Sequence, residues 1–203
     1  KFDYNKKKFT FYNNNPSNAN TIISNSIQSL LEDGSGNIWI GTFSSGLDVL
    51  NPKTGAFTHY TNSPSKLNSL SDNRIYSLVE DRVGNIWIGT YGGGLNKLDR
   101  LIDKFSRFQF KENDSTSISS NATWSLALDD EGDLWIGTFG GGVNVLNLDN
   151  QKFTYYKNHP ADSTSNTDDN IIRIYKDRKG NMWVSTTKGL SRYSKENNTY
   201  KNY

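Results

Sequence analysis

The most informative absence in this 203-residue sequence is cysteine, of which there is none. Disulfide-stabilised folds and thiolate metal centres are therefore excluded, and the redox compartment stays undetermined. No stretch approaches the roughly 18 consecutive apolar residues of a membrane-spanning helix, so we expect no direct membrane insertion by this chain. The first residues, Lys1–Tyr4, also lack the apolar region of a signal peptide. Either a signal was removed or the chain is cut from a longer protein, and the repeat phase described below favours the second.

Charge of one sign is lacking too, because 23 basic and 21 acidic residues are interspersed and leave a formal net charge of +2. Such a chain offers no field that would attract DNA and no basic tail, so we expect no nucleic acid as a partner. Apolar residues make up only 33% of the chain, whereas aromatic residues make up 13%. A core must therefore depend on Trp, Tyr and Phe, which each bury roughly 150–250 Å².

What the sequence does contain is an internal repeat. The stretch Asp81–Leu95, which reads DRVGNIWIGTYGGGL, occurs in four similar copies. A tryptophan stands at the same place in every copy, 48 residues from the next: Trp39, Trp87, Trp135 and Trp183. A fixed period in the range of about 20 to 50 residues is typical of a stacked or radial repeat array. We therefore expect these tryptophans to be structural residues of the repeat.

Each copy predicts four short antiparallel strands. In the second copy, residues 73–80 form the first strand, and a tight turn at Asp81–Asn85 leads to the second strand at residues 86–90. A glycine-rich turn, Gly92–Gly94, leads to the third strand, and another turn leads to the fourth. The fourth strand carries two aromatic residues three positions apart, a spacing that does not fit a flat strand with one apolar face. We expect a bulge or a strong twist there.

The tight turn and the second strand indicate how the copies pack. Asp81 can accept backbone N–H bonds and Gly84 tolerates a positive φ, which is typical of a type I turn closing a hairpin with a G1 bulge. Because side chains alternate along a strand, Trp87 and Gly89 lie on one face and the flanking isoleucines on the other. Both faces are apolar and therefore covered. The glycine leaves a gap beside the indole that a neighbouring sheet can fill.

These features predict an all-β fold, a β-propeller with four four-stranded antiparallel blades of 48 residues. Residues 1–12 align with the end of the first copy, so we read them as the trailing strands of a preceding blade. The blades are then expected at residues 13–60, 61–108, 109–156 and 157–203. Four blades rarely close a ring alone. We expect an arc of a larger ring, completed by further propeller blades or by a second copy of the chain.

The repeat also resembles a known family. Residues Glu80–Asp99, EDRVGNIWIGTYGGGLNKLD, with the aromatic pair that follows them, are similar to the two-component regulator propeller repeat. The resemblance covers essentially the whole chain in four copies. It implies the extracytoplasmic sensor region of a bacterial hybrid two-component histidine kinase, and hence a periplasmic location and a role in signal transduction. Many such sensors respond to glycans. The chain itself carries no kinase module and is expected not to be an enzyme, and the resemblance transfers no ligand-contacting residue.

The fourth copy departs from the others. Ser185 replaces the glycine that follows the tryptophan by two positions, and the next turn is one residue shorter. Asn166 stands where the earlier copies have an apolar residue, namely Ile22, Leu70 and Ile118. We expect the last blade to pack differently.

One rim of the propeller is the candidate binding site. Antiparallel order places the glycine-rich turns and the long connections between copies at the same end of every blade, and long loops are often functional. This rim carries three aromatic residues and three polar residues at nearby strand starts: Phe43, Tyr91, Phe139, Asn73, Arg74 and Asn121. Aromatic faces with amide and guanidinium donors suit an oligosaccharide. The alternative is that the aromatic residues cap the blade core, and we expect Tyr76 and Trp124 in the core or between blades.

No catalytic residue, metal or cofactor is predicted. His59 and His159 occupy different places in their copies and have no partner in sequence that would form a nucleophile or metal site. The acidic turn Asp129–Asp133 offers oxygen ligands suited to Ca²⁺, but the equivalent turns form without them. The glycine-rich turns are followed by a strand, whereas a phosphate loop needs a helix.

The sequence therefore predicts a non-enzymatic sensor or recognition propeller that binds a glycan fragment or a partner at its rim. Two alternatives stay open. Propellers can assemble sites from distant blades, so paired carboxylates could meet at the rim of a hydrolase or lyase acting on polysaccharide. The chain could also be a structural scaffold for protein interaction.

Overall fold

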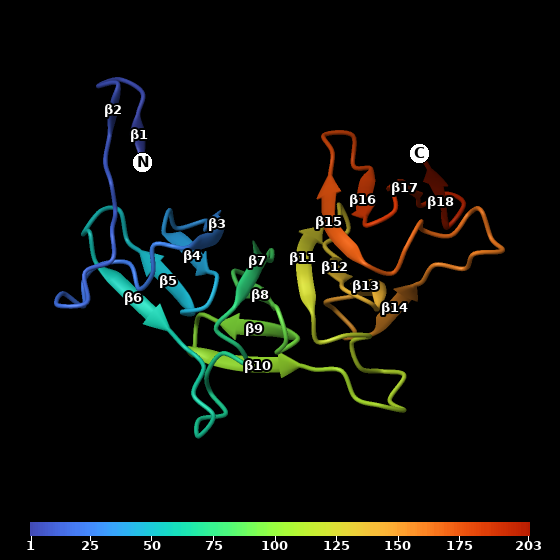
Figure 1. Ribbon diagram of the computed structural model, residues 1–203, viewed down its shortest axis with the longest axis horizontal. Helices are drawn as coiled ribbons and strands as arrows, with labels where there is room; N and C mark the ends of the chain where they lie inside the picture. The colour runs from blue at the N-terminus through green and yellow to red at the C-terminus, as the bar shows by residue number, and fades with distance from the viewer.

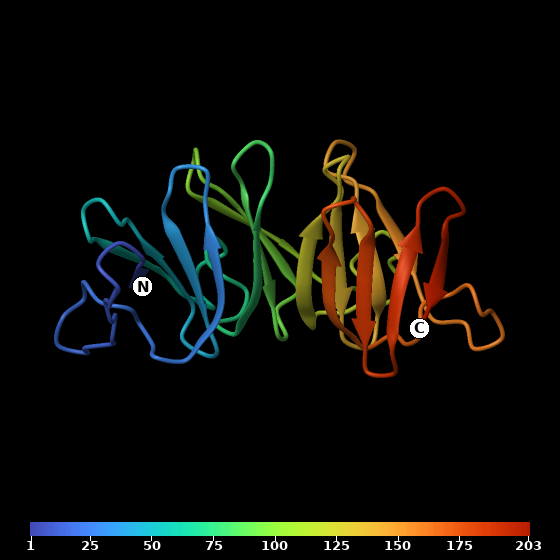
Figure 2. The ribbon, with the colours of Figure 1, turned by 90° about the horizontal axis from the view of Figure 1, so that it is seen from above.

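The computed structural model describes all 203 residues and contains strands and no helix. Four four-stranded antiparallel sheets follow one another along the chain and stand side by side in a curved row (Figure 1, Figure 2). The prediction of an all-β propeller is confirmed, and the sheets form an open arc and not a closed ring. Since the chain forms no helix, it has none that could span a membrane.

The strands of each sheet, which we call a blade, run in chain order from the centre of the arc to its outside (Figure 1). Blade 1 contains β3 (Ile27–Glu32), β4 (Ile38–Thr42), β5 (Leu47–Leu50) and β6 (Phe57–Tyr60). Blade 2 contains β7 (Ile75–Glu80), β8 (Ile86–Thr90), β9 (Leu95–Asp99) and β10 (Lys104–Phe108). Blade 3 contains β11 (Thr123–Leu128), β12 (Leu134–Thr138), β13 (Gly142–Leu146) and β14 (Phe153–Tyr156). Blade 4 contains β15 (Ile171–Lys176), β16 (Met182–Thr186), β17 (Leu190–Ser194) and β18 (Thr199–Asn202).

The predicted tight turn between the first two strands is confirmed. In blade 2, Gly84 has a φ of 87°, and one Asp81 oxygen accepts the backbone N–H groups of Val83 and Asn85 at 3.1 and 2.9 Å. The other Asp81 oxygen accepts the indole N–H of Trp87 at 2.9 Å. The same bond occurs in the other blades at 2.8 to 2.9 Å, from Trp39 to Asp33, Trp135 to Asp129 and Trp183 to Asp177. The aspartate therefore fixes the turn and the indole together.

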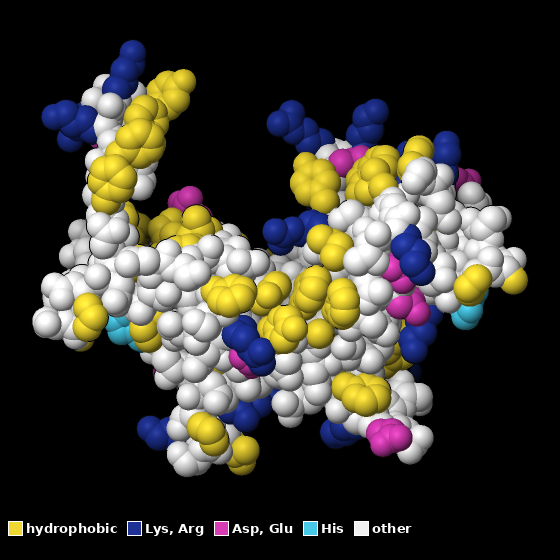
Figure 3. Space-filling model, in the orientation of Figure 1, with side chains coloured by type: hydrophobic (Ala, Val, Ile, Leu, Met, Phe, Trp, Pro, Cys, Tyr) yellow, Lys and Arg dark blue, Asp and Glu magenta, His cyan; other side chains and the backbone are white.

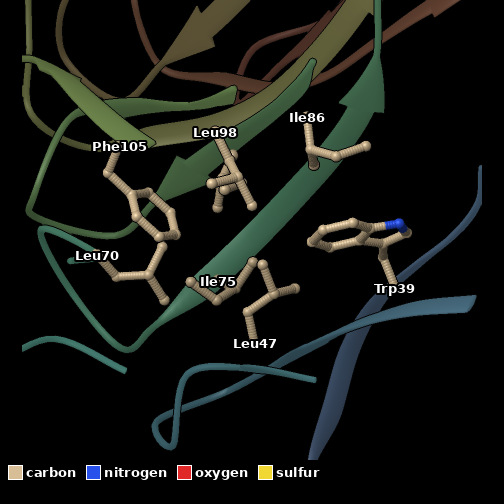
Figure 4. Close-up of a cluster of buried hydrophobic side chains, with 8 residues drawn as sticks. Trp39, Leu47, Leu70, Ile75, Ile86, Leu98 and Phe105 are labelled. Atoms are coloured by element: carbon tan, nitrogen blue, oxygen red, sulfur yellow. The ribbon is translucent and has the colours of Figure 1, made fainter. Parts of the chain in front are cut away.

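The tryptophans of blades 1, 2 and 3 each pack against the blade that follows. Figure 4 shows Trp39 and Leu47 of blade 1 against apolar residues from blade 2. A Cβ atom added to Gly41 would lie 2.7 Å from Ile75 of blade 2, so this position has no room for a side chain. Equivalent clusters join blades 2 and 3 and blades 3 and 4. The predicted gap beside the indole is thus confirmed, and burying each large side chain contributes about 1.5–3 kcal/mol.

The expected bulge in the fourth strand is wrong. β10 pairs regularly with β9, Phe105 opposite Leu98 and Phe108 opposite Leu95. The spacing of three instead puts one ring on each face of the blade: Phe105 joins the cluster shared with blade 1, and Phe108 lies 5.5 Å from Trp87 in the cluster shared with blade 3. The register shifts lie in the innermost strands, as between Ile75 and Ser77.

In each blade, a side chain of the outermost strand forms a hydrogen bond with a backbone carbonyl of the loop that enters the same blade. The residue type differs from blade to blade. His59 lies 2.7 Å from the Ala19 carbonyl, and its other ring nitrogen lies 2.7 Å from the buried carboxylate of Asp48. Arg107, Tyr155 and Asn202 take the equivalent place in blades 2, 3 and 4 and donate to loop carbonyls. The loops are therefore fixed at one register position by four different donors.

Blade 4 differs from the others as its sequence predicts. Trp183 is only half-buried, whereas the other three repeat tryptophans are buried. Asn166 is fully buried where its counterparts are apolar, and its side-chain carbonyl has no hydrogen-bond partner. The face of blade 4 turned away from blade 3 is uncovered, so the indole there lacks the sheet that covers it elsewhere.

Candidate functional site

The rim is built where each glycine-rich turn meets the next blade. The N–H groups of Gly46, Gly94 and Gly142 donate to carbonyls just ahead of the following blade's first strand, at 2.9, 2.9 and 3.0 Å. At Gly93 an added Cβ would lie 2.8 Å from the backbone of Ser71, so the turn lies directly on the entering loop. The turns and the long connections therefore share one end of the arc, as the antiparallel order predicts.

A bulge in the innermost strand places one additional aromatic side chain of each middle blade on this rim. Tyr76 and Trp124 stand at the register shifts of β7 and β11, where one residue is left without a partner on the neighbouring strand. Such a residue is turned away from the regular alternation of the strand. Both side chains are half-buried, and their rings stack with centroids 5.6 Å apart at the junction of blades 2 and 3, so the expected position between blades is confirmed. The equivalent residues of the outer blades, Gln28 and Ile172, are not aromatic.

Four rings form one connected surface, which we call the aromatic platform: Tyr76, Tyr91, Trp124 and Phe139. Trp124 lies at its centre, with ring centroids 4.5 Å from Phe139, 5.6 Å from Tyr76 and 6.3 Å from Tyr91. Tyr91 is 41% exposed and Phe139 42%. The indole N–H of Trp124 is buried and has no hydrogen-bond partner in the chain. Figure 3 shows exposed hydrophobic side chains gathered near the middle of this face, between the second and third blades.

A fixed ion pair stands at the edge of the platform. The guanidinium carbon of Arg74 lies 4.5 Å from the centroid of the Tyr91 ring. Its Nε and Nη2 atoms donate to the two carboxylate oxygens of Asp72 at 3.0 and 2.5 Å. Burial alone would raise the pKa of Asp72, but the hydrogen bonds from Arg74 outweigh it and hold that pKa below its usual value. At neutral pH the pair is therefore charged, with the Arg74 side chain 43% exposed.

The remaining rim residues named from the sequence lie elsewhere or serve the fold. The side-chain oxygens of Asn73 and Asn121 accept the backbone N–H groups of Asn62 and Phe110 at 2.6 and 2.8 Å, so they hold the loops beside the platform. Phe43 is 50% exposed but makes no ring contact with the platform. The structure therefore brings Tyr91, Phe139 and Arg74 together, and it adds Tyr76, Trp124 and Asp72, which the sequence reading did not assign to the site.

The acidic turn of blade 3 is occupied by bonds within the protein. Asp129 accepts the indole N–H of Trp135, Asp130 pairs with Lys176 at 2.7 Å, and Asp133 accepts from Asn147 at 2.8 Å. The chain contains no group of three or more His, Cys, Asp or Glu side chains arranged to hold a metal ion.

Comparison with known sequences places the repeat in a family. The pattern described as "Two component regulator propeller" matches four segments, residues 21–44, 69–92, 117–140 and 166–188. Each segment runs from the end of the entering loop, through the tryptophan strand, to the turn at the rim. No curated protein matches the chain.

Solved structures give the same fold. The extracellular domain of a putative hybrid two component system from B. thetaiotaomicron is 27% identical with a TM-score of 0.80, over 96% of this chain and 26% of that one. The extracellular domain of a putative one component system from the same organism is 25% identical with a TM-score of 0.73, over 100% of this chain and 24% of that one. Virginiamycin B lyase from Staphylococcus aureus is 14% identical with a TM-score of 0.64, over 88% and 55%, which shows the fold alone. The chain thus spans about a quarter of the first two structures.

Proposed function

Since this chain is built from four repeats of the two-component regulator propeller family, we propose that it is a non-enzymatic part of the sensor region of a bacterial signalling protein. Its similarity to two extracellular domains supports a place outside the cytoplasm, and we place it in the periplasm. The chain spans about a quarter of those domains, so the signalling output belongs to other parts of the protein. Its own task is recognition.

The ligand that the rim fits best is a glycan fragment on the aromatic platform. Four connected rings offer flat apolar faces for the C–H faces of two or more sugar units. Sugar hydroxyls need hydrogen-bond partners, and the exposed guanidinium of Arg74 supplies donors beside the rings. The observation that carries this proposal is the connection of rings from two blades around Trp124, with the exposed Arg74 guanidinium at their edge.

The platform also suggests how ligand binding is transmitted to the rest of the protein. Tyr76 and Tyr91 belong to blade 2, whereas Trp124 and Phe139 belong to blade 3. A ligand spanning the platform therefore bridges the two blades and favours the arrangement in which these rings are connected. In a sensor, ligand binding must change the arrangement of the protein, here the position of blade 2 relative to blade 3.

Calorimetric titration with a panel of neutral and acidic oligosaccharides tests the proposal. We expect saturable binding without product, and we expect Trp124→Ala to weaken the best ligand at least tenfold, because a central aromatic contact is worth more than about 1.4 kcal/mol. Phe43→Ala is the control, an exposed ring at the repeat position of Tyr91 and Phe139 that lies outside the platform, and should change affinity less than about twofold. Equal losses in both variants would contradict the assignment.

The same titration separates recognition from catalysis. Chromatography of the mixtures after incubation would reveal shortened or unsaturated sugars if the chain were a hydrolase or lyase. The carboxylate at the edge of the platform, Asp72, is already held by Arg74, which leaves it poorly placed as an acid or base. Turnover of any panel member would overturn the non-enzymatic role.

A further inference from the structure

The aromatic platform has one charged edge, and the two charges on it balance each other. Asp72 and Arg74 stand just before β7 and form a bidentate ion pair, in which Nε and Nη2 of Arg74 donate to Oδ1 and Oδ2 of Asp72 at 3.0 and 2.5 Å. The Asp72 side chain is only 13% exposed, and the backbone N–H of Arg74 also donates to it at 2.9 Å. Figure 3 shows basic and acidic side chains together at the edge of the hydrophobic side chains gathered between the second and third blades.

The corresponding edge of blade 3 is uncharged. The counterparts of Asp72 and Arg74, 48 residues later, are Ser120 and Ala122. The Ser120 hydroxyl donates to the Phe139 carbonyl at 3.0 Å, and the Phe139 N–H donates to the Ala122 carbonyl at 2.9 Å, so both residues lie beside the platform. The platform therefore has an ion pair on the blade 2 side and neutral side chains on the blade 3 side.

An ion pair in this position distinguishes neutral ligands from anionic ones. The Nη1 atom of Arg74 donates to no atom of the chain, so it can donate to a hydroxyl or ring oxygen of a neutral sugar. A carboxylate or sulfate group is bound best by the forked face of a guanidinium, and Asp72 already occupies that face of Arg74. An anionic sugar beside Arg74 would also be repelled by the Asp72 carboxylate. Arg74 thus serves neutral sugars, and Asp72 acts against acidic ones.

We propose that the aromatic platform is specific for neutral glycans, and that Asp72 is the residue that excludes glycans carrying carboxylate or sulfate groups. This inference rests on the proposed function, because it defines the ligand of the same site. Asp72 acts through Arg74, whose charge it balances and whose guanidinium it holds 4.5 Å from the centroid of the Tyr91 ring. The rings themselves stack on neutral and acidic sugars alike, so the choice between the two classes depends on this one carboxylate.

Calorimetric titration with two matched pairs of tetrasaccharides tests the proposal. β-1,4-linked mannotetraose is paired with tetramannuronate, and cellotetraose with its C6-oxidised form, so the members of each pair differ only in the carboxylates at C6. In the parent chain, the dissociation constant of the acidic member should exceed that of the neutral member at least about tenfold. Asp72→Asn keeps the size of the side chain and removes its charge. It should tighten the binding of tetramannuronate at least about tenfold and lower the ratio of the two constants by the same factor, because Arg74 is then available to the sugar carboxylate.

Asp168→Asn is the matched control. Asp168 stands two repeats after Asp72 at the same position of blade 4, outside the platform, where it lies 3.8 Å from Lys188. Its replacement changes the net charge by the same amount and should alter the ratio less than about twofold, whereas an effect of net charge alone would appear equally in both variants. In the double variant Asp72→Asn/Arg74→Gln the gain for acidic sugars should disappear, because the guanidinium that produces it is gone.

A second substitution guards against a fault of folding. Asp72→Ser introduces the residue that blade 3 carries at this position, and it should shift the ratio in the same direction as Asp72→Asn. Thermal unfolding midpoints of both variants should match that of the parent chain.

The outcomes separate this inference from the proposed function. Tighter binding of an acidic tetrasaccharide than of its neutral counterpart by the parent chain would overturn the neutral specificity and leave the glycan-binding role intact. An unchanged ratio in both Asp72 variants would likewise overturn the role of Asp72 alone. Failure of the parent chain and of every variant to bind any oligosaccharide would overturn the proposed function itself, and this inference with it.

Discussion

The two middle blades and the two outer blades share one structural frame and differ in what lies on it. In all four, an aspartate holds a tryptophan across the turn. The middle blades are covered on both faces and carry the aromatic platform, whereas blades 1 and 4 each leave one face uncovered and lack an aromatic residue at the bulge. The repeated residues therefore build the array, and the positions that vary between repeats give the rim its chemistry.

Substitution at the glycine two residues after the tryptophan should show the largest difference in stability between a covered and an uncovered blade face. Gly137→Val would place methyl groups into Ile171 of blade 4, where even a Cβ lies 2.6 Å away, and we expect it to lower the free energy of unfolding by about 3 kcal/mol. Ser185→Val at the uncovered equivalent should change it by less than about 0.5 kcal/mol. Urea denaturation of both variants checks this, and equal losses would show that the glycine serves its own strand and not the junction.

Removing the hydrogen bond between the turn aspartate and the indole should have the second largest effect on the free energy of unfolding. Asp81 is 8% exposed, and Asp81→Ala would leave the indole N–H of Trp87 and two turn N–H groups unpaired, with a loss of about 2 kcal/mol. Asp177→Ala at the uncovered end should cost less, because water can replace the lost bonds. Urea denaturation of both variants checks this. A larger loss of unfolding free energy in Asp177→Ala than in Asp81→Ala would contradict the expected difference between the two blades.

The smallest expected effect is a pH dependence of the free energy of unfolding that comes from blade 1. Burial opposes protonation of His59, but its bonds to the Ala19 carbonyl and to Asp48 outweigh this and raise its pKa above the usual value. The stability it adds is therefore fully present below the unfolded-state pKa of about 6.5 and is lost as pH rises through the higher folded-state pKa.

Replacing His59 with glutamine tests this assignment. The free energy of unfolding, measured at several pH values from 5 to 9, should decline as pH rises in the parent chain, because the pKa of His59 is raised in the folded state. The His59→Gln variant should show a flatter profile over the same range. An unchanged profile in the variant would exclude His59 as the cause.

Most of the fold could be predicted because it depends on residues that repeat. The 48-residue spacing, the tryptophan and the glycine beside it identify the blades and their packing. The spacing of Phe105 and Phe108 was misread because a strand covered on both faces needs no single apolar side. The indole bond of Trp87 was missed, although the constant six-residue spacing from Asp81 is a signal that could have revealed it.

The site was predicted less completely, because it depends on a backbone irregularity. Tyr91 and Phe139 were identified from their place after the second strand, and the structure joins them. Trp124 completes that junction through a register shift of one residue, which changes the side of the strand on which it lies. Regular alternation of side chains along the strand would predict the opposite side for Trp124. The clue in the sequence is that this position is aromatic in two copies, Tyr76 and Trp124, and not in the others.

The most direct test of the recognition site is the indole N–H region of a ¹H–¹⁵N spectrum during titration with the best-binding oligosaccharide. The chain has five tryptophans, four with the indole N–H bound to an aspartate and one, Trp124, with it unpaired. Substitution of Trp124 by phenylalanine identifies its signal. We predict that this signal shifts to saturation while the four aspartate-bound signals stay nearly fixed. A saturated protein with an unmoved Trp124 signal would contradict the aromatic platform as the binding site.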